Sequence, residues 1–356
     1  MTTLDDDQEQ LRSNLELIGR DDINDLEAVL SLVGQYDVEG FHRVPDNCPA
    51  EFTWDYEKGA QEKVVMANAA ANPAQMQWDP AALVGTALEK WDDKRFMQFG
   101  IENQNWLLSQ FMHGEQGALL CTAKIVETVP WIDAKYYAAT QVMDEARHVE
   151  VFSKYLDEKL SGHYPMNAHL GLLLDDIVSD SRWDMTYLGM QIMVEGLALA
   201  AFGFIHMMTT EPLLKKLLRY VMADEARHVA FGVLSLQEYY KELSAAELRE
   251  RQEFAFEAAI RMKDRMAMQE VWERMEVPTS DVIKIMGMAP ERDDFQILLF
   301  SKIVPNLRKL GLLDAADGWL RTKFTELGAI AFEHLTDSTE DEDAFADGSP
   351  ADRQVA

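Results

Sequence analysis

A six-residue sequence occurs twice in this chain of 356 residues without a change of letter. Asp-Glu-Ala-Arg-His-Val spans 144–149 and recurs at 224–229, an offset of 80 residues. A glutamate precedes each Glu-x-x-His by 30 residues, Glu115 in the first half and Glu195 in the second. The chain therefore repeats one plan, a glutamate followed by Glu-x-x-His, in two halves.

The Glu-x-x-His spacing suits a metal site on a helix. Residues three apart lie on one helix face, so Glu145 with His148, and Glu225 with His228, can each direct two ligands at one ion. A single such pair is more often an ordinary surface pair. Two identical copies with matching upstream glutamates favour metal ligation instead.

The middle of each 30-residue interval carries a turn signal. Residues 128–130 and 209–212 both combine threonine, a helix-capping residue, with a proline suited to a first helical turn. Two antiparallel helices joined at such a midpoint hold their glutamates at equal depth. Each half is therefore predicted to be a helical hairpin.

Four buried, unpaired carboxylates would be costly, and two divalent cations would neutralise them. Oxygen-rich ligation with one imidazole per metal favours two iron ions, with manganese possible, over zinc. No catalytic residue is predicted beyond the metal ligands. These ligands are Glu115, Glu145, His148, Glu195, Glu225 and His228.

Each motif also carries an aspartate before its glutamate and an arginine before its histidine. A metal-bound histidine normally donates its other ring N–H to a carboxylate or carbonyl, so we expect the aspartate of one motif to bind the histidine of the other. The arginines would balance the charge, and surface Asp–Arg pairs are the alternative. The residues concerned are Asp144, Arg147, Asp224 and Arg227.

The helix faces around Glu115 and Glu195 are mostly apolar, as a dry pocket for dioxygen and an apolar substrate requires, although such stripes are also ordinary core. The candidate pocket residues are Leu108, Phe111, Met112, Thr122, Phe152, Gln191, Leu199 and Phe202.

Apolar residues at three- and four-residue spacings predict an all-α fold. The long helices are expected at 86–127, 131–160, 182–208 and 213–242. The expected organisation is an N-terminal extension of short helices and loops (1–80), a four-helix bundle (81–243), additional C-terminal helices packed on the bundle (244–334) and a disordered acidic tail (335–356).

Composition excludes several classes of partner. With 62 acidic against 33 basic side chains the net charge is −29, which disfavours nucleic acid. The start of the chain lacks a signal-peptide pattern, and no apolar run suggests a membrane span. Only Cys48 and Cys121 are present, which suits a reducing compartment. We expect a soluble, cytoplasmic protein.

Residues 81–243 resemble the ferritin-like di-iron carboxylate superfamily, in which two helices each supply a glutamate and two supply Glu-x-x-His. Its members include ribonucleotide reductase small subunits, bacterial monooxygenase hydroxylases, acyl-carrier-protein desaturases and arylamine N-oxygenases. The resemblance implies dioxygen activation, electrons from a reductase or ferredoxin, and a homodimer.

Hallmarks of the familiar branches are missing. Phe152 stands where the radical-generating reductase subunit has tyrosine, and Val221 where arylamine N-oxygenases have a third histidine. Leu199 and Ala198 stand where monooxygenases and desaturases carry threonine. The chain is thus similar to an outlying member of the oxygenase group.

The resulting hypothesis is a non-haem di-iron oxygenase that hydroxylates or N-oxygenates a small, apolar organic substrate. The alternatives are an iron-binding, storage or ferroxidase-type ferritin-like protein, or a radical-generating reductase-like subunit.

Overall fold

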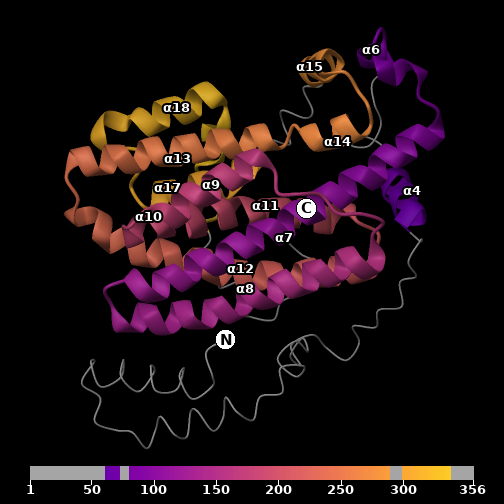
Figure 1. Cartoon of the computed structure of the whole chain (residues 1–356). Helices are drawn as coiled ribbons and strands as arrows, with labels where there is room; N and C mark the ends of the chain where they lie inside the picture. Colours follow the sequence, from indigo (N-terminus) through magenta and orange to yellow (C-terminus); the bar gives the residue numbers. More distant parts are fainter. Residues whose placement is uncertain (1–60, 73–79, 289–298, 338–356) are drawn as a thin grey trace, which may run out of the picture. The chain divides into compact units, whose positions relative to one another are not determined.

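The computed structural model describes residues 61–72, 80–288 and 299–337, and every element in these ranges is helical (Figure 1). The all-α prediction is confirmed. The predictions for residues 1–60, and for the acidic tail from 338 onwards, lie outside the described residues.

The first hairpin consists of α7 (Asp93–Thr128) and α8 (Ile132–Lys159). Asp92 caps α7 by accepting a hydrogen bond from the Arg95 backbone N–H at 2.8 Å. The helix thus begins later than the predicted residue 86, and a short 3₁₀ turn, η1 (Ala87–Lys90), precedes it. The break between the two helices contains Pro130, as the turn signal predicts.

A helix that the sequence analysis did not predict, α9 (Ala168–Ser179), joins the two hairpins and packs against α7. Asn167 caps it by accepting from the backbone N–H groups of His169 and Leu170. Gly117 allows the close approach to α7, because a Cβ there would lie 2.4 Å from a methyl carbon of Leu174. The capping asparagine before an apolar run was the available signal.

The second hairpin begins with α10 (Trp183–Tyr187), a π-helical segment η2 (Leu188–Val194) and α11 (Glu195–Met208). Helical structure therefore runs without a break over the predicted range 182–208 apart from its first residue, and the π-helical segment in its middle is a feature that the sequence analysis did not predict. A π segment of this kind interrupts the regular helical repeat just before Glu195. Trp183–Met208 is long and apolar enough to cross a membrane, but 72% of its most apolar window is buried, as in a core helix.

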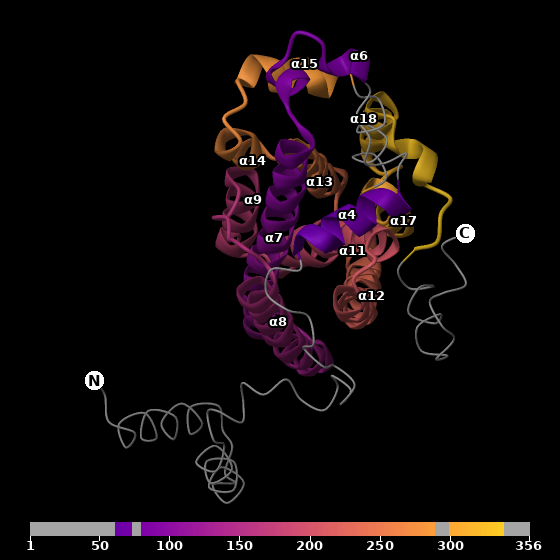
Figure 2. The ribbon, with the colours of Figure 1, turned by 90° about the vertical axis from the view of Figure 1, so that its right-hand side faces the viewer.

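The return helix α12 (Pro212–Tyr239) ends in a 3₁₀ turn, η3 (Tyr240–Glu242). Its cap is Glu211, whose carboxylate accepts from the backbone N–H groups of Leu213 and Leu214, while Pro212 occupies the first turn. The two hairpins lie next to one another (Figure 2), with α8 contacting α12, and α7 contacting α10 and η2.

A fifth long helix, α13 (Ala245–Arg265), packs on α9 and η2. It begins with a capping box in which Ser244 and Glu247 satisfy each other's backbone N–H groups. Two neighbours, α17 (Ile303–Lys309) and α18 (Trp319–Leu327), contact η2 and α13 respectively. The remaining elements are α4 (Gln61–Ala71), α6 (Pro80–Leu83), α14 (Gln269–Arg274), α15 (Thr279–Met288), η4 (Leu299–Ser301), η5 (Ala316–Gly318) and η6 (Ala329–Phe332).

Candidate metal centre

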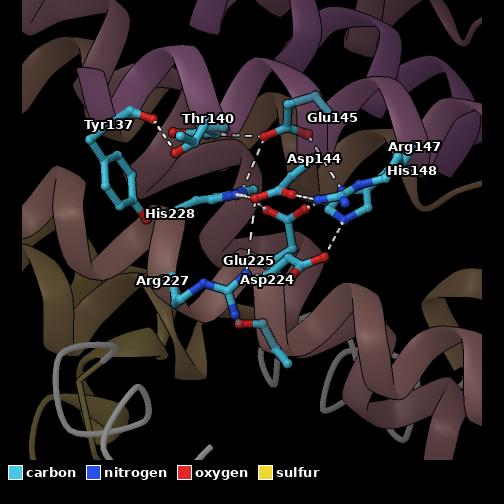
Figure 3. A network of polar contacts seen from close by, with 12 residues as sticks. Tyr137, Thr140, Asp144, Glu145, Arg147, His148, Asp224, Glu225, Arg227 and His228 are labelled. Carbon is cyan, nitrogen blue, oxygen red and sulfur yellow. Dashed lines mark hydrogen bonds and ion pairs between the residues drawn. The ribbon is translucent and has the colours of Figure 1, made fainter. Parts of the chain in front are cut away.

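The six predicted metal ligands converge inside the paired hairpins. Each is at most 5% exposed. α7 supplies one glutamate, α8 and α12 each supply Glu-x-x-His, and the last glutamate is the first residue of α11. Four of them, Glu145, His148, Glu225 and His228, face one another in Figure 3.

Their ligand atoms form two overlapping groups, each with all atoms within 4.8 Å of one another. Both groups contain Glu145 and Glu225. One group adds Glu115 and His148, and the other adds Glu195 and His228. This geometry suits two metal ions that share the two central carboxylates and have one terminal glutamate and one histidine each.

The histidine rings present Nδ1 to the carboxylates. His148 Nδ1 lies 2.9 Å from a Glu225 oxygen and 3.3 Å from a Glu115 oxygen. His228 Nδ1 lies 3.1 Å from a Glu145 oxygen. Nδ1 is therefore the nitrogen placed to bind a metal in both halves.

Without cations, protons must neutralise this cluster. Burial, together with the charge of Glu225, raises the pKa of Glu115 from 4.5 to about 8. Burial also raises the pKa of Glu195 well above its usual value, with Glu225 adding to the effect. Both pKa shifts favour the protonated form of these carboxylates.

The pKa values of the two histidines and of Glu145 shift in the directions that favour a positive charge on the histidines and a negative charge on the glutamate. Burial alone would lower the pKa of each histidine, but the carboxylates around His148 and His228 outweigh it and raise both pKa values well above 6.5. Burial would raise the pKa of Glu145, yet both histidines outweigh it and lower that pKa. Two divalent ions would replace these protons.

The ligand set fits such ions by its chemistry. Glu195 Oε2 is buried and has no hydrogen-bond partner among the described residues. Carboxylate oxygens with one imidazole per ion suit iron or manganese, whereas no cysteine thiolate belongs to either group.

The aspartates form the crossed arrangement expected from the sequence. His148 Nε2 lies 3.2 Å from Asp224 Oδ2, and His228 Nε2 lies 3.3 Å from Asp144 Oδ2. Each ring can thus donate its N–H to an aspartate while Nδ1 faces the cluster. Arg147 pairs with Asp144, and Arg227 pairs with Asp224 (Figure 3).

A further polar residue, Gln141, was missed by the sequence analysis. Its Nε2 donates to Glu145 Oε1 at 3.0 Å and to Glu195 Oε1 at 3.1 Å, so it ties α8 to α11. The signal was its position four residues before Glu145, on the same helix face. The sequence gives no indication that Glu195 would lie within its reach.

A cavity of about 30 Å³ lies beside the cluster. Glu115, Glu195 and Glu225 form part of its wall, together with apolar side chains of α7 and α11. α13 closes another side with Met262 and Arg265, which the sequence analysis did not connect with the site. A helix without a ligand motif offers no sequence signal for such a contact.

Two of the eight candidate pocket residues, Phe111 and Phe202, line this cavity. Phe152 is fully buried and packs against both rings, at centroid distances of 5.9 and 5.8 Å. Thr122 and Gln191 are also fully buried, but outside the lining. The structure likewise puts Leu108, Met112 and Leu199 outside the lining.

The chain matches no protein-family model and no curated protein. Three solved structures of mutants of an R2-like ligand-binding oxidase with a reconstituted Mn/Fe cofactor are similar to it. Their sequence identities are 15, 18 and 17%, and their TM-scores 0.39, 0.36 and 0.39. The alignments cover 80–82% of this chain and 96–97% of those chains. At this identity and TM-score, the likeness alone does not establish a shared reaction.

Proposed function

We propose that this protein is a non-haem di-iron oxygenase of the ferritin-like type. The main support for this proposal is the pair of overlapping ligand groups, which share Glu145 and Glu225 and lie beside an apolar cavity. Two bound iron ions would supply the reduction of dioxygen and the oxidation of a substrate bond, with manganese as the possible replacement.

The protein's own residues have distinct tasks in this proposal. Glu115 with His148, and Glu195 with His228, would hold one ion each, and the two shared glutamates would hold both. Asp144 and Asp224 keep the histidine rings oriented. The apolar side chains around the cavity, such as Phe111 and Phe202, exclude bulk water and accommodate an apolar substrate.

We propose hydroxylation or N-oxygenation of a small organic molecule as the reaction. The electrons would come from a separate reductase or ferredoxin, and the net charge of −29 suits a donor with a basic surface. A cytoplasmic homodimer follows from the composition and the superfamily resemblance, and is part of the same proposal.

The alternative of iron storage or simple ferroxidation predicts no organic product. The apolar cavity against three of the ligand carboxylates favours the oxygenase. Phe152, fully buried beside Phe111 and Phe202, disfavours the radical-generating alternative because it cannot form a tyrosyl radical.

The test is anaerobic loading with ferrous iron, followed by mixing with dioxygen in the presence or absence of candidate amines and hydrocarbons. We expect about two irons per chain, and dioxygen uptake that rises with substrate and matches organic product. Glu145→Ala and Glu225→Ala should lose the iron. Glu158→Ala is the control, because Glu158 is an exposed α8 residue whose ion pair in the described part of the chain is with Lys154. Dioxygen uptake without organic product, and mineralisation of many irons per chain, would support storage instead.

A further inference from the structure

Arg265 is a buried cation at the wall of the cavity. It is the last residue of α13, is 4% exposed, and lines the same space as Glu115, Glu195 and Glu225. Its Nε has no hydrogen-bond partner within the described ranges. Desolvation lowers the pKa of its guanidinium to about 10, which leaves it charged at neutral pH.

No carboxylate of the described chain forms an ion pair with Arg265. Glu270 attracts it electrostatically, but the two Glu270 oxygens accept from Trp106 Nε1 at 2.9 Å and Asn167 Nδ2 at 2.7 Å. The polar contact that Arg265 does make is weak, from Nη1 to the thioether sulfur of Met262 at 3.6 Å.

Arg251, on the same helix, shows what a structural arginine looks like here. It is equally buried, at 3% exposed, and its guanidinium donates to both oxygens of Asp184, at 2.9 and 3.3 Å. A buried charge without such a partner costs several kcal/mol. Arg265 therefore needs an anion that the residues in the described ranges do not supply.

The metal centre does not need this positive charge either. Four glutamates balance two divalent ions, and Asp144 and Asp224 pair with Arg147 and Arg227. A metal-loaded site is thus close to neutral before Arg265 is counted, and one positive charge is left over at the cavity wall.

We propose that Arg265 binds the carboxylate of the substrate, so that the substrate class is an apolar molecule with one carboxylate group. This inference rests on the proposed function and names its substrate. A guanidinium offers a planar set of donors that matches a carboxylate. The apolar body of the molecule would then pack against Phe111, Phe202 and Met262, close to the ligand glutamates.

The test measures binding and requires neither dioxygen nor turnover. The full-length, ferrous-loaded protein is titrated anaerobically by calorimetry with carboxylates from propanoate to hexanoate, and with the matching primary amides. Wild type should prefer each carboxylate to its amide. Arg265→Gln should weaken carboxylate binding at least about tenfold and leave amide binding unchanged.

Arg261→Gln is the matched control. Arg261 lies one turn earlier on α13 and pairs with Asp176 and Glu257 near the surface, so this variant should bind carboxylates as wild type does. Carboxylate binding that is undiminished in Arg265→Gln would overturn the proposal, because the metal ions alone would then hold the carboxylate. A wild type without preference for carboxylates would overturn it as well.

Arg265→Met separates a binding role from a structural one. An unpaired buried cation destabilises the empty site, so this variant should unfold at the same or a higher temperature than wild type, and hexanoate should no longer stabilise it. A large loss of thermal stability without ligand would contradict the proposal. Iron binding and dioxygen uptake are measured separately, so failure of the carboxylate site leaves the proposed oxygenase testable.

Discussion

The two halves of the repeat carry the same ligands but surround them differently. At the offset of 80 residues, the first half's Phe111 corresponds to Gln191. Phe202 of the second half corresponds to Thr122, and Val221 to Gln141. The surroundings of the ligands are therefore apolar at Phe111 and Phe202 and polar at Gln141, although the six ligands themselves follow a symmetric plan.

The apolar and the polar residues contact different parts of the metal centre. The apolar residues Phe111 and Phe202 line the cavity beside three of the ligand glutamates, where the proposed substrate would lie. At the polar end, Gln141 holds Glu145 and Glu195 by hydrogen bonds. The duplicated hairpin thus surrounds the ligands with an apolar cavity on the side of Phe111 and Phe202 and with a support end at Gln141.

The backbone differs between the halves as well. Glu115 lies within the regular helix α7, whereas Glu195 follows the π segment η2. Gly232 of α12 lies so close to η2 that a Cβ there would be 2.7 Å from Gln191 Cβ. π segments are frequent at functional sites, and this one changes the orientation of the residues that precede Glu195.

The largest effects are expected at the two shared glutamates. Glu145→Gln and Glu225→Gln should each lose both metal ions, because each residue belongs to both ligand groups. Glu115→Gln and Glu195→Gln should keep about one ion per chain. Metal analysis after anaerobic loading and desalting measures this. Loss of the same number of metal ions in all four variants would show that Glu145 and Glu225 are not shared between the two ions.

The crossed aspartates should have the next largest effect. Asp224→Asn and Asp144→Asn should each lower the affinity for one of the two metal ions by roughly 10- to 100-fold. Asp224→Asn would act through His148, and Asp144→Asn through His228. Competition with a chelator gives the affinities. Unchanged metal affinities would show that these aspartates only form ion pairs with the arginines and do not support the metal-binding histidines.

The support end is tested by Gln141→Leu, which removes the amide that joins Glu145 and Glu195. We expect a loss of metal affinity of roughly tenfold. Val221→Gln, at the corresponding position of the other half, is the matched control and should leave the affinity nearly unchanged. Equal effects of both substitutions would mean that the two ends are equivalent.

The metal-free protein should lose stability as the pH rises. The folded pKa of Glu115 is about 8 against 4.5 for the free group, and both histidine pKa values lie above 6.5, so the folded state holds protons that the unfolded chain releases. Stability from these groups is fully present below pH 4.5 and declines up to about pH 8 and beyond. Glu145 and Asp224, whose pKa values are lowered, add the opposite trend only below about pH 4.5.

Metal ions should reverse this dependence, because they replace the protons and bind more tightly as the pH rises. Urea unfolding across the pH range, with chelator or with ferrous iron under nitrogen, measures both trends. Metal-free stability that increases between pH 4.5 and 8 would contradict the protonation pattern of the cluster.

The sequence predicted what depends on spacing along single helices. The Glu-x-x-His pairs and the hairpin turns follow from helical geometry. The pairing of Asp144 with His228 lies between two helices, and it was predicted from ligand chemistry, because a metal-bound histidine needs an acceptor for its other ring N–H. The role of Gln141 was not predicted, because its partner Glu195 is 54 residues away in the sequence and is brought close only by helix packing. The position of Arg265 and Met262 at the cavity was not predicted for the same reason, because no sequence pattern indicates that α13 packs beside the cavity.

The most direct test of the account is anomalous diffraction from crystals of the iron-loaded protein, measured on both sides of the iron absorption edge. The account predicts two peaks per chain. One should lie beside His148 Nδ1 and Glu115 and the other beside His228 Nδ1 and Glu195, with Glu145 and Glu225 between them. A single peak, or iron bound away from these residues, would contradict a two-metal centre.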